Sequence, residues 1–392
     1  MDNHIEKQRF PSVTNVGLGL HKSSGGTAQA VEDFSEALKA RTIAFANINR
    51  FKQEGFFSEH TIPALFPGRG LRSAYSWPHS NELSSANNIA KDTDMFCCHI
   101  LYRYHVQWVR EQIRKRPRPY WVVPHGCLDP FTYHTRFLIK WFWMNLLGKS
   151  FIREASLVIF ATHQERKKAA HWCRPNQARV VYWPVEIKDM QSTTTLNTWR
   201  DRLNIPLKDR ILLFLGRLHD VKRPLEIIDA FAKSGVENMH LVIAGPEENI
   251  TIEQCEKRSK QLNIKNVHMV GPVYGAEKKS LFEESDGFIS FSKKENFGYV
   301  TAEALYAGKP VILSPGNDLG PEIKEEDCAW ILAEDSEACA ISAIKSFALS
   351  SSDQLHAMGE RGKRWCLNNL SFDVFEKKLI TLSQDTVRQF KN

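Results

Sequence analysis

The chain has 392 residues, of which 42% are hydrophobic and 25% charged, and its formal net charge is +7. This composition excludes a chain that is disordered throughout, and the length predicts two domains rather than one. No apolar stretch reaches the roughly 18 residues that a membrane-spanning helix needs, and the first residues lack the apolar centre of a signal peptide, so we expect a cytoplasmic protein.

Two series of strands follow one another along the chain. Short β-branched or aromatic runs alternate with longer polar segments of helical period, which is typical of parallel sheets built from βαβ units. In the first half, we expect strands near residues 12–17, 41–47, 95–101, 120–124, 156–161 and 180–184. In the second half, we expect them near residues 210–215, 240–244, 267–271, 287–291, 310–314 and 329–332. The predicted fold class is α/β, with two doubly wound Rossmann-like domains facing a central cleft.

A polar interval separates the two series. Residues 191–206 hold no apolar strand and are the predicted linker between a first domain over 1–190 and a second over 207–370. Apolar residues at helical spacing in 371–392 predict a closing helix that packs back on the first domain.

Gly25 and Gly26 stand between the first strand and a helix-like segment. Glycines there let the backbone approach a phosphate or an acceptor, but a simple turn explains them equally well. Asp92 and Asp94 form a DxD pair, a type of site that holds a metal in other transferases. They precede a strand, whereas a cleft of this fold lies where strands end, so we predict no metal site.

Residues 101–190 are unusually basic, with 16 Lys and Arg against 6 Asp and Glu, and they hold six of the ten tryptophans. Such a region favours an anionic partner, which could be nucleic acid, a phospholipid surface or an acidic lipid-linked sugar. The alternative is a solvated face beside a core rich in tryptophan.

His125 comes directly after a predicted strand, in the segment Pro124-His-Gly-Cys-Leu-Asp-Pro130. A histidine at a strand end can donate a hydrogen bond to a sugar hydroxyl near the reacting carbon, although a lone histidine is often structural. Thr162 and Glu165 fit a helix capping box, and we assign them no chemistry.

Arg217 and Lys222 follow the first strand of the second series, in Gly216-Arg-Leu-His-Asp-Val-Lys222. Two cations at a strand end can neutralise a diphosphate leaving group. The alternative is a pair of solvated surface charges.

Glu295 and Glu303 stand eight residues apart around Asn296-Phe-Gly-Tyr299. Gly298 lets the backbone pass close to an anion where a helix begins, so that the helix's first N–H groups point at a phosphate. Glu303, one to two turns into that helix, can accept hydrogen bonds from the diol of a ribose. Glu295 can hold hydroxyl groups of a second sugar.

These residues together resemble the group 1, or family four, nucleotide-sugar glycosyltransferases of GT-B fold, which include bacterial polysaccharide and lipopolysaccharide hexosyltransferases. The resemblance covers nearly the whole chain and is strongest from Ile211 to Ser314. The segment 124–130 also looks like a signature of a polysaccharide-forming branch. One departure is Tyr182-Trp-Pro-Val-Glu186, where many relatives have an Asn-Gly turn.

The resemblance implies an acceptor-binding first domain and a donor-binding second domain. Arg217 and Lys222 would bind the donor diphosphate and Glu303 its ribose. His125 and Glu295 would act at the transferred sugar. The backbone amides of Asn296, Phe297, Gly298 and Tyr299 would face sugar or phosphate.

The implied reaction is a retaining hexosyl transfer without metal or cofactor, from a nucleotide diphosphate sugar to a saccharide or lipid-linked acceptor in polysaccharide synthesis. UDP-glucose is the first choice of donor, and no nucleic acid is expected. The protein would work in the cytoplasm, at the inner face of an anionic membrane. The alternatives are a nucleotide-sugar epimerase of similar architecture, and a non-catalytic saccharide or nucleic-acid binder.

Overall fold

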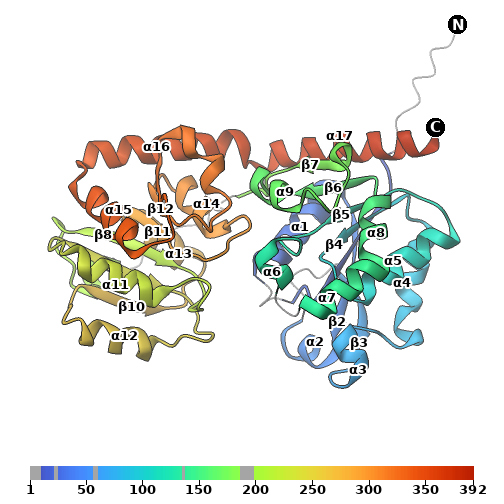
Figure 1. Cartoon of the computed structure of the whole chain (residues 1–392), viewed down its shortest axis with the longest axis horizontal. Coiled ribbons are helices and arrows are strands. Elements are labelled where there is room, and N and C mark those ends of the chain that lie inside the picture. The colour runs from blue at the N-terminus through green and yellow to red at the C-terminus, as the bar shows by residue number, and fades with distance from the viewer. Residues whose placement is uncertain (1–9, 22–24, 56–60, 135–136, 186–197) are drawn as a thin grey trace, which may run out of the picture. The chain divides into compact units, whose positions relative to one another are not determined.

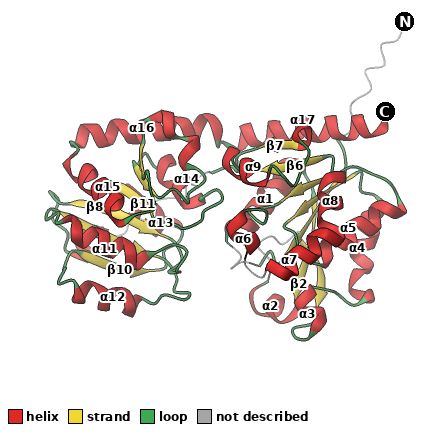
Figure 2. Ribbon diagram, in the orientation of Figure 1, coloured by secondary structure: helices red, strands yellow, loops and turns green. Residues whose placement is uncertain are grey.

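The computed structural model describes residues 10–21, 25–55, 61–134, 137–185 and 198–392 (Figure 1). The chain divides into two compact units: Met1–Pro184 with Phe372–Asn392, and Val185–Ser371. We call them the N-terminal and C-terminal units. Each is a parallel sheet with helices against it (Figure 2).

The N-terminal unit has a seven-stranded sheet in the order β3-β2-β1-β4-β5-β6-β7. Its strands are β1 (Val13–Leu18), β2 (Arg41–Asn47), β3 (Thr61–Phe66), β4 (Met95–His99), β5 (Tyr120–Val123), β6 (Leu157–Phe160) and β7 (Ala178–Val180). Its helices are α1 (Gly26–Leu38), α2 (Ile48–Glu54), α3 (Leu71–Tyr75), α4 (Ser84–Lys91), α5 (Tyr104–Lys115), α6 (Pro130–His134), α7 (Phe137–Trp143), α8 (Lys149–Glu154), α9 (His163–Ala169) and α17 (Phe372–Lys391).

The C-terminal unit has a six-stranded sheet in the order β10-β9-β8-β11-β12-β13. Its strands are β8 (Arg210–Leu215), β9 (Met239–Ala244), β10 (Val267–Gly271), β11 (Gly287–Ser290), β12 (Val311–Leu313) and β13 (Ala329–Ile331). Its helices are α10 (Trp199–Leu203), α11 (Pro224–Ser234), α12 (Ile252–Gln261), α13 (Gly275–Glu284), α14 (Tyr299–Tyr306), α15 (Glu337–Leu349) and α16 (Ser352–Asn369).

Both sheets are doubly wound. All of their paired strands are parallel, and in each sheet the strand order reverses beside the first strand, between β1 and β4 and between β8 and β11. Ligands of such sheets bind at the carboxyl ends of the strands around this reversal. The predicted α/β class with two Rossmann-like domains is confirmed, and the cleft between them stays a prediction.

Two expectations about single strands were wrong. Strand β3 was not predicted, because Pro63 interrupts its apolar run; the strand lies at the sheet edge, where a missing N–H costs no ladder bond. The strand expected at 180–184 is β7, which ends at Val180.

Part of the predicted linker is helical. Residues 186–197 lie outside the described residues, but α10 falls within the interval 191–206. Trp199 at its start is buried, and its backbone N–H donates to Glu284 Oε1 over 3.0 Å. Trp199, the one buried residue of this helix, therefore holds α10 to the C-terminal unit.

The closing helix α17 packs on α1 of the N-terminal unit. Phe375 lies against Phe34, with ring centroids 5.2 Å apart. Thr386 Oγ1 accepts a hydrogen bond from Trp121 Nε1 over 3.0 Å. Helix α17 therefore completes the core of the N-terminal unit.

Candidate active site

The loops after β8 and β9 meet closely at the carboxyl edge of the second sheet. Gly216 N–H donates to Ala244 O over 2.9 Å, and a Cβ on Gly245 would lie 1.8 Å from Gly216 O. Only glycine fits at 245, so the backbones of the two loops pack directly against each other, and this contact fixes the position of the loop after β8. Arg217 and Lys222 follow from this fixed point.

Lys222 and Glu295 form an ion pair across the strand-order reversal. Lys222 lies in the loop after β8 and Glu295 in the loop after β11, and Lys293 N–H joins the two loops by donating to Val221 O over 2.8 Å. Burial, followed by the charge of Arg217, lowers the pKa of Lys222 to about 8. An anion that binds beside such a partly buried lysine favours its charged form and so raises its pKa again.

Arg217 points to a different carboxylate. Its guanidinium donates to Glu248 Oε2 over 2.6 Å, in the loop after β9, and its side chain is largely exposed. Its charge nevertheless acts on Lys222, so the two cations share one electrostatic site. An exposed ion pair of this kind is weak, and its partner is easily exchanged for a phosphate.

The segment from Glu295 to Tyr299 is held by backbone bonds to the loop after β12. Glu295 N–H donates to Gly316 O, and Asp318 N–H donates to Glu295 O, both over 2.8 Å. Gly298 has φ 76° and precedes α14, where no side chain caps the helix. Asn296 Oδ1 is buried without a hydrogen-bond partner among the described residues. This geometry suits the predicted approach of a helix start to an anion.

Glu303 is partly buried in α14 and pairs with a residue that the sequence reasoning missed. Lys278 of α13 donates to Glu303 Oε1 over 2.6 Å, while Oε2 has no partner among the described residues. Burial raises the pKa of Glu303, and Lys278 opposes that shift. The only signal in the sequence was a lysine near a helix start, where acidic residues are favoured.

The four charged residues of the predicted donor site therefore form three separate ion pairs. Lys222 and Glu295 contact one another, Arg217 contacts Glu248, and Glu303 contacts Lys278. All lie on loops or helices that follow the carboxyl ends of the strands. Their roles toward a donor stay predictions.

His125 lies at the corresponding edge of the first sheet, in a chain of neutral polar groups. Its Nε2 is 3.0 Å from Nδ1 of His99, whose Nε2 is 3.2 Å from Asn15 Oδ1. Burial lowers the pKa of His125 to about 3 and that of His99 well below its usual value. Both rings are therefore uncharged at neutral pH. The sequence offered one signal for His99: it lies at the end of β4, and His125 follows the neighbouring strand β5.

A carboxylate and an indole fix the loop that carries His125. Glu165 Oε1 accepts from Gly126 N–H over 2.7 Å, and its Oε2 accepts from Ala161 N–H over 2.8 Å. Thr162 caps α9 as predicted, because its hydroxyl oxygen accepts from Glu165 N–H. The carboxylate of Glu165 accepts from the two loop amides. Trp183, within the sequence departure, lies 5.6 Å from the His125 ring between centroids.

Gly25 and Gly26 begin α1 at the same edge of the first sheet. Gly25 has φ 62°, and a Cβ there would meet nothing within 4 Å. Their role in binding stays a prediction. Asp94 of the DxD pair lies at the opposite edge, where its carboxylate accepts from Ser12 N–H over 2.9 Å.

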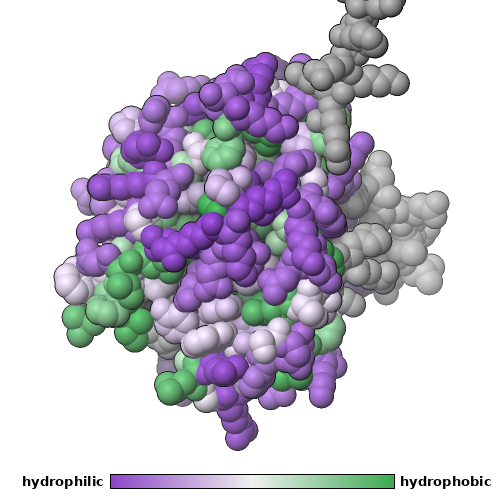
Figure 3. Space-filling view, turned by 90° about the vertical axis from the view of Figure 1, so that its right-hand side faces the viewer, coloured by the Kyte–Doolittle hydropathy of each residue, from purple (hydrophilic) through white to green (hydrophobic). Residues whose placement is uncertain are grey.

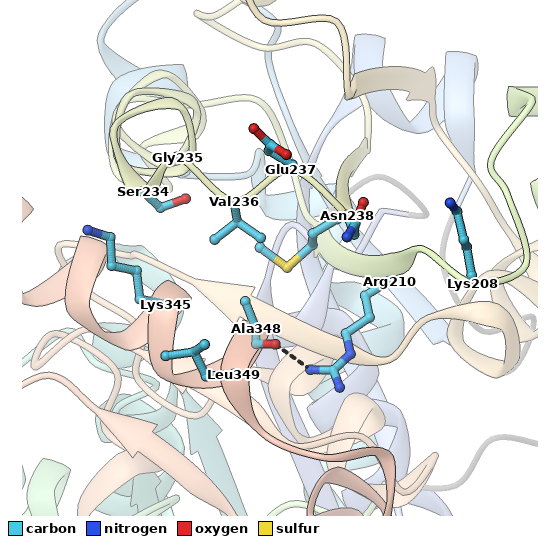
Figure 4. Close-up of a pocket in the computed structure, with 11 residues that line it drawn as sticks. Lys208, Arg210, Ser234, Gly235, Val236, Glu237, Asn238, Lys345, Ala348 and Leu349 are labelled. Atoms are coloured by element: carbon cyan, nitrogen blue, oxygen red, sulfur yellow. Dashed lines mark hydrogen bonds between the residues drawn. The ribbon is translucent and has the colours of Figure 1, made fainter.

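A basic pocket lies at the other end of the second sheet (Figure 4). Lys208, Arg210 and Lys345 line it, and Arg210 donates to Ala348 O over 2.9 Å. Because it lies at the amino ends of β8 and β9, it is far from the loops that hold Lys222 and Glu295, and we do not assign the donor to it.

Comparison with known proteins bears on the second unit most directly. Residues 196–365 match the family model described as glycosyl transferases group 1. The C-terminal unit is a group 1 glycosyltransferase domain. The resemblance read from the sequence is confirmed, and its strongest stretch, Ile211 to Ser314, falls within this domain.

Curated and solved relatives extend the likeness. N-acetyl-alpha-D-glucosaminyl L-malate synthase of Bacillus anthracis is 24% identical over 258 residues, which are 64% of this chain and 65% of that protein. The chain thus spans about two thirds of this curated relative, and less of others.

Two solved structures share the fold along nearly the whole chain. Sucrose-phosphate synthase of Thermosynechococcus elongatus has a TM-score of 0.72 at 17% identity, covering 96% of this chain and all of that one. Anabaena HepE, solved with UDP and glucose, has a TM-score of 0.72 at 15% identity and covers 94% and 99%. The GT-B fold predicted from the sequence is confirmed. The group 1 match begins at residue 196 and does not include His125, whose role stays a prediction.

Proposed function

We propose that this protein is a retaining, metal-independent glycosyltransferase that transfers a hexose from a nucleotide diphosphate sugar to a saccharide or lipid-linked acceptor in polysaccharide synthesis. The observation that carries the proposal is the Lys222–Glu295 ion pair at the strand-order reversal of a group 1 domain. It brings a cation for the leaving diphosphate and an acid for sugar hydroxyls to one point.

Donor binding would exchange the contacts of this pair. The diphosphate takes Lys222 and the exposed Arg217, which releases Glu295 to accept hydrogen bonds from the sugar. The unpartnered Glu303 Oε2 accepts from the ribose, while Lys278 holds the other oxygen in place. The helix start at Gly298 adds its dipole to the phosphate site.

The acceptor hydroxyl then attacks the anomeric carbon from the face that the diphosphate leaves, and its proton passes to the departing phosphate oxygen. The carbon–oxygen bond to the diphosphate breaks as the new glycosidic bond forms. His125 is neutral, because burial lowers its pKa to about 3, so it serves by hydrogen bonding and not as a cation.

UDP-glucose remains our first donor. Support comes from the HepE structure, which holds UDP and glucose. The Bacillus anthracis relative, named for an N-acetylglucosaminyl product, makes UDP-N-acetylglucosamine the second donor to test. The acceptor class rests on the resemblance of the segment 124–130.

The test is incubation of the purified chain with UDP-glucose, UDP-galactose, UDP-N-acetylglucosamine and GDP-mannose, with EDTA present. We expect release of one nucleoside diphosphate, and NMR of the released or transferred sugar should show that it first appears with the donor's α configuration. A sugar converted while still attached to UDP would support the epimerase instead. An intact donor with every nucleotide sugar would contradict enzyme activity.

Membrane association was predicted from the basic, tryptophan-rich region 101–190, and the structure weakens that reason. Trp108, Trp121, Trp143, Trp172 and Trp183 are all buried, which leaves Trp141 exposed. The tryptophans of this region are mainly core residues. No helix among the described residues is long and apolar enough to cross a bilayer.

A further inference from the structure

A continuous helical segment of the N-terminal unit presents apolar side chains on both of its faces. It runs through α7, a π-helical turn (Met144–Gly148) and α8, which follow one another in Figure 1. Trp143, Met144 and Phe151 are buried, so its inner face belongs to the core. A helix that is apolar all round is either buried in protein or in contact with lipid.

The outer face of this segment is exposed. We call it the α7 patch, and with one residue of α6 it consists of Phe131, Leu138, Ile139, Trp141, Phe142 and Leu146. Leu138 is 76% and Phe142 63% exposed. Figure 3 shows that such hydrophobic side chains gather in groups on an otherwise largely hydrophilic face. A contiguous group of large apolar side chains on a surface marks an interaction site.

Packing holds the patch rigidly outward. The rings of Trp143 and Tyr102 pack edge to face with centroids 5.0 Å apart. A Cβ on Gly148 would lie 2.4 Å from the Trp143 ring and 2.5 Å from Met144 Sδ, so glycine lets both side chains turn inward. The exposed residues of the patch cannot join them, because the inner positions are filled.

The charges of this helical segment are mainly positive. From Phe137 to Glu154 the segment contains three basic residues, Lys140, Lys149 and Arg153, and one acidic residue, Glu154 at its end. Lys149 and Arg153 are exposed. A symmetric contact between two copies of this chain would set these cations against one another, with only Glu154 of the segment to offset them.

We propose that the α7 patch inserts in plane into the surface of an anionic bilayer. The aromatic and aliphatic side chains would enter the boundary between headgroups and acyl chains, and the flanking cations would contact lipid phosphates. The segment is anchored in the core of the N-terminal unit, so the bilayer would contact the unit that carries His125. This goes beyond the proposed transfer reaction and does not require it.

The test is cosedimentation of the full chain with vesicles of phosphatidylcholine mixed with phosphatidylglycerol, and with vesicles of phosphatidylcholine alone. We expect binding to the mixed vesicles, weakened by salt. The double variant Leu138→Gln with Phe142→Gln should bind at least ~10-fold more weakly, because two buried apolar contacts with lipid are lost. Both positions are exposed, so the melting temperature should not change.

The matched control is Leu207→Gln with Leu349→Gln, two leucines of the C-terminal unit that are 90% and 86% exposed. This control should bind vesicles like the unaltered chain. The proposal is overturned if the unaltered chain ignores mixed vesicles or if the α7 variant binds them equally well. It is also overturned if the α7 variant instead abolishes a concentration-dependent self-association, since the occupant is then a second copy. Vesicle binding is measured without a donor, so an inactive enzyme would leave this result standing.

Discussion

The two units place different chemistry at the same topological position. At the carboxyl edge of the second sheet, Lys222 and Glu295 meet as opposite charges across the strand-order reversal. At the carboxyl edge of the first sheet, His99 and His125 meet as neutral rings. The same fold therefore presents a charged site in one unit and an uncharged polar site in the other.

This difference matches the two halves of a sugar transfer. A nucleotide diphosphate carries charge and needs cations for binding, whereas a sugar hydroxyl is neutral and needs hydrogen bonds. Substitutions in the C-terminal unit should change donor binding, and substitutions in the N-terminal unit should change turnover. The predictions that follow use this contrast.

The largest expected effect is from Lys222→Ala. The change removes the partly buried cation and leaves Glu295 facing the diphosphate, so UDP affinity in a calorimetric titration should fall ~100-fold, or about 3 kcal/mol. Lys222→Arg should retain most of the affinity. Lys233→Ala is the control, because Lys233 also pairs with a glutamate, Glu337, but on an exposed surface. Unaltered UDP binding by Lys222→Ala would remove this residue from the donor site.

His125→Ala should act on turnover. Loss of one hydrogen bond at the reacting carbon should lower kcat by roughly tenfold to a hundredfold, with UDP affinity unchanged. His171→Ala, at an exposed histidine of the same unit, is the matched control. If His125→Ala weakened UDP binding and left kcat intact, the assignment of roles to the two units would be wrong.

The pH dependence of donor binding should report Lys222. Burial lowers its pKa to about 8 in the free protein, and the diphosphate binds the protonated form. Affinity for UDP should therefore change little just below that pH and fall about tenfold per pH unit above it. Lys222→Arg should abolish this fall, since arginine stays charged. A fall that persisted in Lys222→Arg would assign the titration to another group.

Gly298→Ala should have the smallest effect, on stability. Gly298 has φ 76°, and a Cβ there would lie 3.0 Å from Glu295 Cγ, so we expect the free energy of unfolding to decrease by about 1–2 kcal/mol. Gly235→Ala is the control, because φ is 65° there but a Cβ meets nothing within 4 Å. A thermal melt should show the greater loss for Gly298→Ala, and equal losses would contradict the close contact with Glu295.

Much of this architecture could be predicted because buried parallel strands leave a clear pattern. The run Ile211 to Leu215 is apolar throughout, as expected for a strand covered on both faces. Strand β3 was missed because a proline is allowed at a sheet edge, which periodicity alone does not reveal. Helix α10 was not predicted, because its one buried residue, Trp199, does not produce a helical period of apolar residues.

The site could be predicted only in part, because strand ends show which residues share an edge but not which side chains pair. Sequence order placed Arg217, Lys222 and Glu295 at one edge. It could not show that Arg217 reaches Glu248, or that Lys278, from a different helix, supports Glu303. Those pairs depend on the positions of the loops relative to the sheet. Contacts between loop backbones, such as that of Gly245 with Gly216, determine these positions.

The most direct test of the central claim, that the C-terminal unit binds a nucleotide diphosphate sugar, is a titration with UDP and with its 2′,3′-dideoxyribose analogue. We predict that the analogue binds the unaltered chain ~100-fold more weakly, because the free oxygen of Glu303 is left buried without its hydroxyl partners. Glu303→Gln should bind the two ligands more nearly alike. GDP and ADP, titrated in parallel with their dideoxy analogues, cover the other bases. Equal affinity of every nucleotide and its dideoxy analogue for the unaltered chain, or no binding at all, would contradict the account.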